Sequence, residues 1–318
     1  AWKRRVSLLL LLENRGRFSN WENRLQRKVP KVLQEDYHMA VFITGGFGHI
    51  GSWMARHFAL KNKKVVLYDV KERKLDYLEE CLPNIRYIKG SVLDLPGLEK
   101  ALSSVEEGIE GIVHTVGIMG ELVLGDPYTN SLVNINGTLG VLEAARKRKI
   151  KKIVYTSTGA VYGALSGIAR ELEHPPNPAD LYSATKTSSE FLGLRYADTF
   201  GMDFRAGRVY FVYGPGKRPS QFINLYRLVF GALEGLTGLS SDKGGDQRLD
   251  FIHVEDAAKG LCLLFEAEKP AYKIYNLATG VPVALPEAAD LAYRYSKLKK
   301  EKAVFGPGVL MQRCEALD

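Results

Sequence analysis

Residues 41–51 read VFITGGFGHIG, an apolar strand pattern that runs into a glycine-rich turn. The glycines follow the pattern GxxGxxG at Gly45, Gly48 and Gly51, or GxGxxG when Gly46 is counted first. Glycines at this spacing permit a tight turn and let backbone N–H groups approach a pyrophosphate at a helix start, and the last one lets helix and strand pack closely. The stretch therefore predicts the strand, turn and helix that open a dinucleotide-binding fold.

A second strand pattern, at 64–69, ends in an acidic residue that strengthens this interpretation. Asp69 follows Gly51 by 18 residues, close to the spacing at which a carboxylate accepts hydrogen bonds from the adenosine ribose. The same carboxylate repels a 2′-phosphate, so NAD is the predicted cofactor. Lys71 and Arg73 follow closely and would compensate that repulsion, which keeps NADP as the alternative.

Strand-like and helix-like segments alternate along the chain from Met39 onward. The strand patterns lie at 40–44, 64–69, 85–89, 111–115, 152–157 and 203–209, and the helical patterns near 50–61, 72–80, 95–104, 127–148 and 180–199. This alternation predicts an α/β fold, a Rossmann doubly wound parallel sheet covered by helices on both faces.

The alternation breaks down in the last third of the chain. After residue 210 a Gly/Pro loop at 214–219, a helical pattern, a polar loop at 240–248 and smaller pieces follow. We therefore expect an NAD-binding Rossmann domain at 39–210. A smaller C-terminal α/β subdomain at 211–318 should mainly bind substrate, with its chain crossing back to the sheet. The ligand should lie in the crevice between the two.

Residues 1–38 form a basic N-terminal extension with nine Lys/Arg and four Asp/Glu, a net charge of +5. The rest of the chain carries only +3 of the total of +8. Because the basic excess lies outside the body of the chain, no nucleic-acid partner is predicted. The extension imitates a signal peptide at 3–12 but lacks a small-residue cleavage site, so we interpret it as a peripheral helix or an upstream addition.

The composition is that of a soluble globular protein, 46% hydrophobic and 25% charged. No apolar run is long enough for a membrane span, so no integral membrane segment is predicted. Cys81, Cys262 and Cys314 are widely scattered and lack metal-ligand spacing. They indicate reduced thiols in a cytoplasmic protein and no metal site.

A tyrosine and a lysine at helical spacing are the candidate catalytic pair. Tyr182 and Lys186 lie four residues apart, which places both on one face of a helix. A neighbouring ammonium and an oxidised nicotinamide ring favour a phenolate, so the phenol can act as a base near neutral pH. Thr158, at the end of the fifth strand pattern, offers a hydroxyl to the reacting oxygen.

Several segments occur in the order and spacing of the extended short-chain dehydrogenase/reductases. They are TGGFGHIG, the downstream Asp69, DPYTNSLVNINGTLGVLEAA, YTSTGAVYG, YSATK, VYGPG and DFIHVEDAAKGL. The sequence resembles the NAD-dependent epimerase/dehydratase family over about residues 40–280. The resemblance implies that Tyr182 is the catalytic acid/base, that Lys186 lowers its pKa and binds the nicotinamide ribose, and that Thr158 hydrogen-bonds the substrate oxygen.

The resemblance also implies a cofactor site and a dimer. The predicted cofactor-binding residues are Gly45, Gly48, His49, Ile50, Gly51, Asp69, Ser91, Val92, Thr115, Val116, Gly117, Asn134, Tyr182 and Lys186. In relatives the helices equivalent to 127–148 and 180–199 pair two subunits, so a homodimer is expected.

Three positions depart from the family pattern. Ser91 stands where the family has an Asp that holds the adenine amino group, and Phe211 stands where nucleotide-sugar enzymes have an Asn that contacts the substrate diphosphate. Arg248 is displaced by one residue from the position of the family's diphosphate-pairing Arg. Arg218 and Arg248 either bind an anion or are solvated, and Tyr162 is expected as a pocket wall. The predicted substrate set is Tyr162, Phe211, Arg218 and Arg248.

The predicted function is oxidation of a secondary alcohol of a sugar or nucleotide-sugar by hydride transfer to NAD, with epimerase or dehydratase chemistry. Phe211 keeps a simple dehydrogenase acting on a free sugar, sugar acid or small hydroxy compound as an alternative. A non-catalytic dinucleotide-binding protein on the same fold is the alternative of another class.

Overall fold

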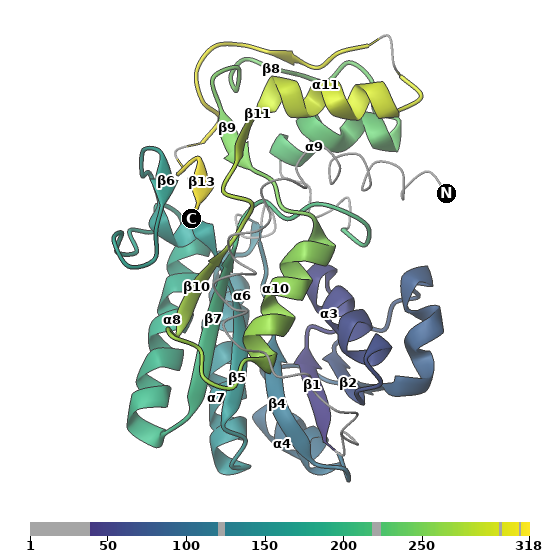
Figure 1. Cartoon of the computed structure of the whole chain (residues 1–318), viewed down its shortest axis with the longest axis vertical. Helices are drawn as coiled ribbons and strands as arrows, with labels where there is room; N and C mark the ends of the chain where they lie inside the picture. The colour runs from purple at the N-terminus through teal and green to yellow at the C-terminus, as the bar shows by residue number, and fades with distance from the viewer. Residues whose placement is uncertain (1–38, 120–124, 218–223, 299–300, 312) are drawn as a thin grey trace.

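The computed structural model describes residues 39–119, 125–217, 224–298, 301–311 and 313–318. The basic extension 1–38 and Arg218 lie outside these residues. A seven-stranded sheet with the order β10-β7-β5-β4-β1-β2-β3 forms the centre of the molecule, and all its pairings are parallel (Figure 1). Its strands are β1 (Ala40–Thr44), β2 (Val65–Asp69), β3 (Ile85–Lys89), β4 (Ile109–His114), β5 (Lys152–Thr158), β7 (Asp203–Val209) and β10 (Ile274–Leu277). The predicted Rossmann sheet is confirmed.

Helices cover both faces of the sheet, and the side chains of β1 show why. Val41 and Ile43 point into a core with α3 (His49–Leu60) and α10 (Val254–Glu266). Ala40 and Phe42 point into the opposite core with α4 (Leu95–Ser103), α7 (Gly137–Lys147) and α8 (Leu181–Phe200). A strand buried on both faces needs an unbroken apolar run, and this run is the pattern that predicts β1 from the sequence.

Two predicted helices take different forms. The helical pattern near 72–80 becomes a 3₁₀ helix, η1 (Asp76–Asn84), which contains Pro83. Proline lacks the N–H that a longer α-helical ladder needs. The pattern at 127–148 divides into α6 (Pro127–Ser131), a π-helical segment η2 (Leu132–Asn136) and α7.

The chain after residue 210 contributes to two regions. α10 and β10 belong to the sheet layers, since β10 pairs with β7. The remaining pieces gather beyond one end of the sheet, at the top of Figure 1. They are α9 (Asn224–Phe230), η5 (Gly231–Glu234), β8 (Ser240–Ser241), β9 (Arg248–Asp250), β11 (Pro282–Ala284), α11 (Leu285–Tyr295) and β12 (Val304–Phe305). The last strand, β13 (Ala316–Leu317), returns beside β6 (Ile168–Ala169).

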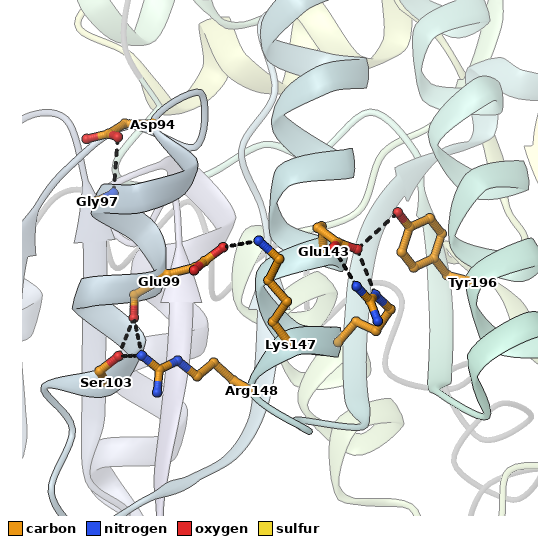
Figure 2. Close-up of polar contacts among 9 residues, drawn as sticks. Asp94, Gly97, Glu99, Ser103, Glu143, Lys147, Arg148 and Tyr196 are labelled. Atoms are coloured by element: carbon orange, nitrogen blue, oxygen red, sulfur yellow. Dashed lines mark hydrogen bonds and ion pairs between the residues drawn. The ribbon is translucent and has the colours of Figure 1, made fainter.

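The outer surface of α4, α7 and α8 carries polar contacts between neighbouring helices (Figure 2). Lys147 of α7 donates to Glu99 of α4 at 2.8 Å. Glu143 of α7 binds Arg146 at 2.7 and 2.8 Å and accepts from Tyr196 of α8 at 3.5 Å. Exposed pairs of this kind stabilise little individually. Within the described ranges, no helix has the length and apolar character needed to traverse a bilayer.

Candidate active site

The glycine-rich turn joins β1 to α3 through contacts that admit no side chain. Gly45 has a φ of +73°, which favours glycine. A Cβ at Gly51 would lie 2.4 Å from the Gly45 carbonyl oxygen and 2.7 Å from Oγ1 of Thr115, and one at Gly48 would lie 2.9 Å from the same carbonyl. The turn therefore brings α3 close to the ends of β1 and β4, with the positive end of the helix at the edge of the sheet.

Asp69 lies against this turn at the end of β2. Its carboxylate accepts hydrogen bonds from the backbone N–H of Phe47 at 3.0 Å and of Lys71 at 3.4 Å. Arg73 donates to the Phe47 carbonyl at 2.9 Å and to the Gly216 carbonyl at 3.5 Å. The Phe47 N–H is therefore bound by an anion, Asp69, and the Phe47 carbonyl by a cation, Arg73. The balance of these two charges affects the choice between NAD and NADP.

We expect Asp69→Ser to weaken NAD binding by about tenfold or more, because charge-assisted hydrogen bonds to the ribose are lost. NADP should gain relative to NAD, since Arg73 then faces a 2′-phosphate without a competing carboxylate. Fluorescence titration with NADH and NADPH measures both effects. Asp76→Asn, at an exposed position of η1, is the matched control. Unchanged NADH affinity in Asp69→Ser would exclude this role for Asp69.

Four further predicted cofactor-binding residues lie at the start of α3 and after β3. His49 and Ile50 open α3, and the Nε2 atom of His49 lies 3.2 Å from the Gly214 carbonyl oxygen. Burial lowers the pKa of His49 well below its usual value, and the Lys217 charge adds to that effect. Ser91 follows β3, where its hydroxyl accepts from the N–H of Leu93 at 3.2 Å. Val92 beside it is buried.

The segment after β4 is held by an asparagine on the π-helical turn. The side-chain oxygen of Asn134 accepts from the N–H of Ile118 at 2.9 Å, and its amide donates to the Ile118 carbonyl at 3.1 Å and to Thr185 Oγ1 at 2.9 Å. These bonds fix the course of Thr115, Val116 and Gly117. A Cβ at Gly117 would lie 3.6 Å from Lys186 Nζ, so the segment passes directly by α8. π-Helical turns are frequent at functional sites.

Tyr182 is the second residue of α8, and a capping box fixes its position. The carboxylate of Asp180 accepts from the N–H of Ser183 at 2.7 Å, while Ser183 Oγ accepts from the N–H of Asp180 at 3.1 Å. Thr158, the last residue of β5, lies near the Tyr182 phenol and lowers its pKa against the larger effect of burial. Thus the predicted pair of phenol and threonine hydroxyl meets at the end of β5.

Lys186 lies one helical turn beyond Tyr182 and over an aromatic ring. Its Nζ atom is 4.2 Å from the ring centroid of Tyr155. Burial lowers the pKa of Lys186 to about 7, and the Glu190 charge acts in the opposite direction. Burial also raises the pKa of Tyr182, while Thr158 and the Arg313 charge lower it. In the protein alone, both groups are therefore shifted toward their neutral forms.

A buried ion pair that the sequence did not predict lies between α8 and β7. Arg208 of β7 donates to both oxygens of Glu190 on α8, at 3.0 and 2.7 Å, and to the hydroxyl of Tyr162 at 2.7 Å. Tyr162 in turn donates to Asn276 Oδ1 at 2.9 Å. The hydroxyl of Tyr162 is thus engaged in this network. The available signal was the presence of two arginines, Arg205 and Arg208, within a strand pattern.

The chain's last residues return to the start of α8, which no local motif indicated. Arg313 forms an ion pair with Asp180, the N-cap residue of that helix. Cys314 is buried, and its carbonyl oxygen accepts from the hydroxyl of Tyr210. A cation from a distant part of the sequence therefore lies near Tyr182.

Comparison with known proteins agrees with this geometry. The family model described as "NAD dependent epimerase/dehydratase family" matches residues 41–278, about three quarters of the chain. The chain belongs to the NAD-dependent epimerase/dehydratase family.

Named relatives of this family align with most of the chain. It is 28% identical to the UDP-glucuronate 4-epimerase of Thermodesulfobacterium geofontis, covering 81% of this chain and 82% of that protein. It is 29% identical to a dTDP-glucose 4,6-dehydratase of Actinoplanes sp., covering 76% and 77%. The UDP-glucose 4-epimerase structure from Thermotoga maritima superposes with a TM-score of 0.77 at 24% identity, covering 88% and 90%. The expected family, fold and NAD dependence are confirmed.

The positions that depart from the family pattern lie beyond the carboxyl ends of the strands. Phe211 has a φ of +25° and packs on Tyr210, Tyr226 and Phe251, at centroid distances of 4.6, 6.4 and 6.0 Å. Arg248 is exposed and donates to the Pro282 carbonyl at 2.7 Å, between β9 and β11. Phe211 is thus part of an aromatic cluster, and Arg248 belongs to the two-stranded sheet of β9 and β11.

Proposed function

We propose that this chain oxidises a secondary alcohol of a nucleoside-diphosphate sugar, as an NAD-dependent epimerase or dehydratase. The observation that carries the proposal is the arrangement of three side chains: Tyr182 at the start of α8 lies near Thr158 at the end of β5, and Lys186 follows one helical turn later. Two named relatives, a UDP-glucuronate 4-epimerase and a dTDP-glucose 4,6-dehydratase, add support for the sugar nucleotide.

The three side chains have separate tasks in this proposal. Thr158 orients the substrate hydroxyl by a hydrogen bond, and Tyr182 removes its proton. NAD, when bound, supplies the hydride acceptor and a positive ring that favours the phenolate. Lys186 holds the cofactor ribose and adds positive potential when protonated. Lys186 itself is buried, which strengthens its electrostatic effect.

The cofactor would lie along the glycine-rich turn, Asp69 and the segment after β4. Gly45, Gly48 and Gly51 allow the tight turn that leads into the start of α3, where a helix N-terminus favours a pyrophosphate. Gly117 leaves room beside Lys186 and Asn134, where a Cβ would meet only those side chains at 3.6 and 3.8 Å. The residues present therefore fit a dinucleotide along the whole edge.

Turnover of defined sugar nucleotides tests the proposal. The NAD-loaded protein is incubated with UDP-glucose, UDP-glucuronate and dTDP-glucose, and products are followed by NMR and by NADH absorbance. An epimer or a dehydrated sugar without net NADH supports the proposal. If none of the three is converted, the proposed substrate class is wrong.

A simple dehydrogenase is the second candidate, and Phe211 is the observation that favours it. An aromatic ring cannot replace the hydrogen bonds of an amide to a diphosphate. Stoichiometric NADH from a free sugar, a sugar acid or a small hydroxy compound would support this candidate. Tight NAD binding without conversion of any of these compounds would instead support a non-catalytic dinucleotide-binding protein.

We also propose a cytoplasmic homodimer that pairs the outer faces of α7 and α8. Leu139 of α7 is 37% exposed, and Leu181 and Phe191 of α8 are 40% and 52% exposed. Exposed apolar side chains on adjacent helices are typical of an interface. A monomer mass in analytical ultracentrifugation would contradict this pairing.

A further inference from the structure

Lys217 lies in the loop after β7 and folds back onto the start of that loop. Its Nζ atom donates to the carbonyl oxygen of Val212 at 2.9 Å and lies 3.7 Å from the ring centroid of Tyr226. The hydroxyl of Tyr226 donates to the same carbonyl at 2.9 Å. The loop thereby brings an ammonium group to the residue that directly follows Phe211.

This ammonium has no carboxylate partner among the described residues of the chain. The groups that face it are His49 from the start of α3 and Tyr226 from α9, with Arg73 close by at the Gly216 carbonyl. An ammonium has three N–H donors, and one of them is used by Val212. Burial of an uncompensated cation is unfavourable, and it lowers the pKa of Lys217 to about 7.

Lys217 lies close to residues that are expected to face the substrate. The Tyr226 ring under the ammonium packs on Phe211 at a centroid distance of 6.4 Å. The charge of Tyr182 adds to the burial that raises the pKa of Tyr226. Phe211 stands where the resemblance to nucleotide-sugar enzymes implies an Asn that contacts the diphosphate. The cation of Lys217 therefore lies beside the residue that follows the position of that missing amide.

We propose that Lys217 is a diphosphate-binding residue of the substrate pocket and supplies the anion contact that Phe211 does not make. The inference rests on the proposed function in assigning that diphosphate to a sugar nucleotide. The cofactor pyrophosphate shares the same chemistry, and His49 at the start of α3 is close to Lys217. The experiment must therefore separate substrate from cofactor.

A pH dependence of diphosphate binding follows from the charge of Lys217. Only the protonated amine attracts an anion, and free Lys217 loses its proton as the pH rises through about 7. Affinity should therefore be full below that pH and should fall above it. The facing groups add no charge change there, because burial lowers the pKa of His49 and raises that of Tyr226.

Calorimetric titration of the NAD-loaded protein with inorganic pyrophosphate tests this proposal without requiring turnover. Lys217→Met removes the charge, Lys217→Arg keeps it at every accessible pH, and Lys243→Met removes an exposed lysine as the matched control. Titrations at about pH 6 and about pH 8 compare the protonated and neutral forms of Lys217. NAD affinity and melting temperature of each variant report on the cofactor site and on folding.

We expect Lys217→Met to weaken pyrophosphate binding by about tenfold or more at the lower pH. NAD affinity should be unchanged, and thermal stability should not fall, because an uncompensated buried cation is removed. Lys217→Arg should bind pyrophosphate nearly as the parent does and lose the part of the pH dependence due to Lys217.

Two results would overturn the proposal: unchanged pyrophosphate binding in Lys217→Met, or weakened NAD binding, which would assign Lys217 to the cofactor. A third result separates the two proposals. If pyrophosphate binding depends on Lys217 but none of the sugar nucleotides is converted, only the proposed substrate is wrong.

Discussion

Tyr182→Phe should lower turnover by about 10²- to 10⁴-fold, the usual contribution of a positioned acid/base. The phenyl ring keeps the packing of the start of α8, while the oxygen that would accept the substrate proton is lost. NAD affinity should stay within about twofold, since no cofactor contact in the proposal depends on the phenol alone. The measurements are kcat on the identified substrate and a fluorescence titration with NADH.

Tyr196→Phe provides a matched control on the same helix. Its hydroxyl reaches Glu143 of α7 at 3.5 Å (Figure 2). This variant should retain the parent turnover. Parent-like activity in Tyr182→Phe would exclude Tyr182 as the acid/base, and equal losses in both variants would point to a general effect on α8.

Glu190→Ala should lower the free energy of unfolding by about 3–5 kcal/mol, the cost of breaking a buried pair by removing one partner. Arg208 is only 2% exposed and would remain as an unpaired guanidinium under α8. Although burial works against it, hydrogen bonding to Glu190 holds the pKa of Arg208 above its usual value, so Arg208 stays charged at neutral pH. Urea unfolding measures the loss.

The exposed pair of Glu143 and Arg146 is the control for this variant (Figure 2). Its side chains are 24% and 38% exposed, and such pairs contribute below about 1 kcal/mol. Glu143→Ala should therefore cost much less than Glu190→Ala. Similar costs for the two variants would contradict the assignment of Arg208 and Glu190 as a structural pair.

Local patterns in the sequence were enough for most strands of the sheet and for the helix that carries Tyr182 and Lys186. β1 and β7 have the predicted bounds, and β1 shows the continuous apolar run that a strand buried on both faces requires. Tyr182 and Lys186 could be paired from their spacing, since residues four apart on a helix share a face. Their neighbour Thr158 was found by its place at a strand end.

Other parts of the site were beyond local patterns. The π-helical turn at Asn134 depends on the amide binding Ile118, a contact across 16 residues. Arg313 reaches Asp180 across 133 residues, and Arg208 reaches Glu190 from a neighbouring strand. Sequence spacing carries no information about which distant side chains meet once the helices pack on the sheet.

By itself the sequence determined the Rossmann sheet, the glycine-rich turn with Asp69, and the helix that carries Tyr182 and Lys186. Each of these depends on residues close together in the chain, where periodicity and steric limits act directly. Tertiary structure alone decided the electrostatics of the site: the burial that shifts Tyr182 and Lys186 toward neutrality, and the position of Lys217 beside Phe211. Those properties arise from desolvation and from contacts between distant segments, which exist only when the chain is folded.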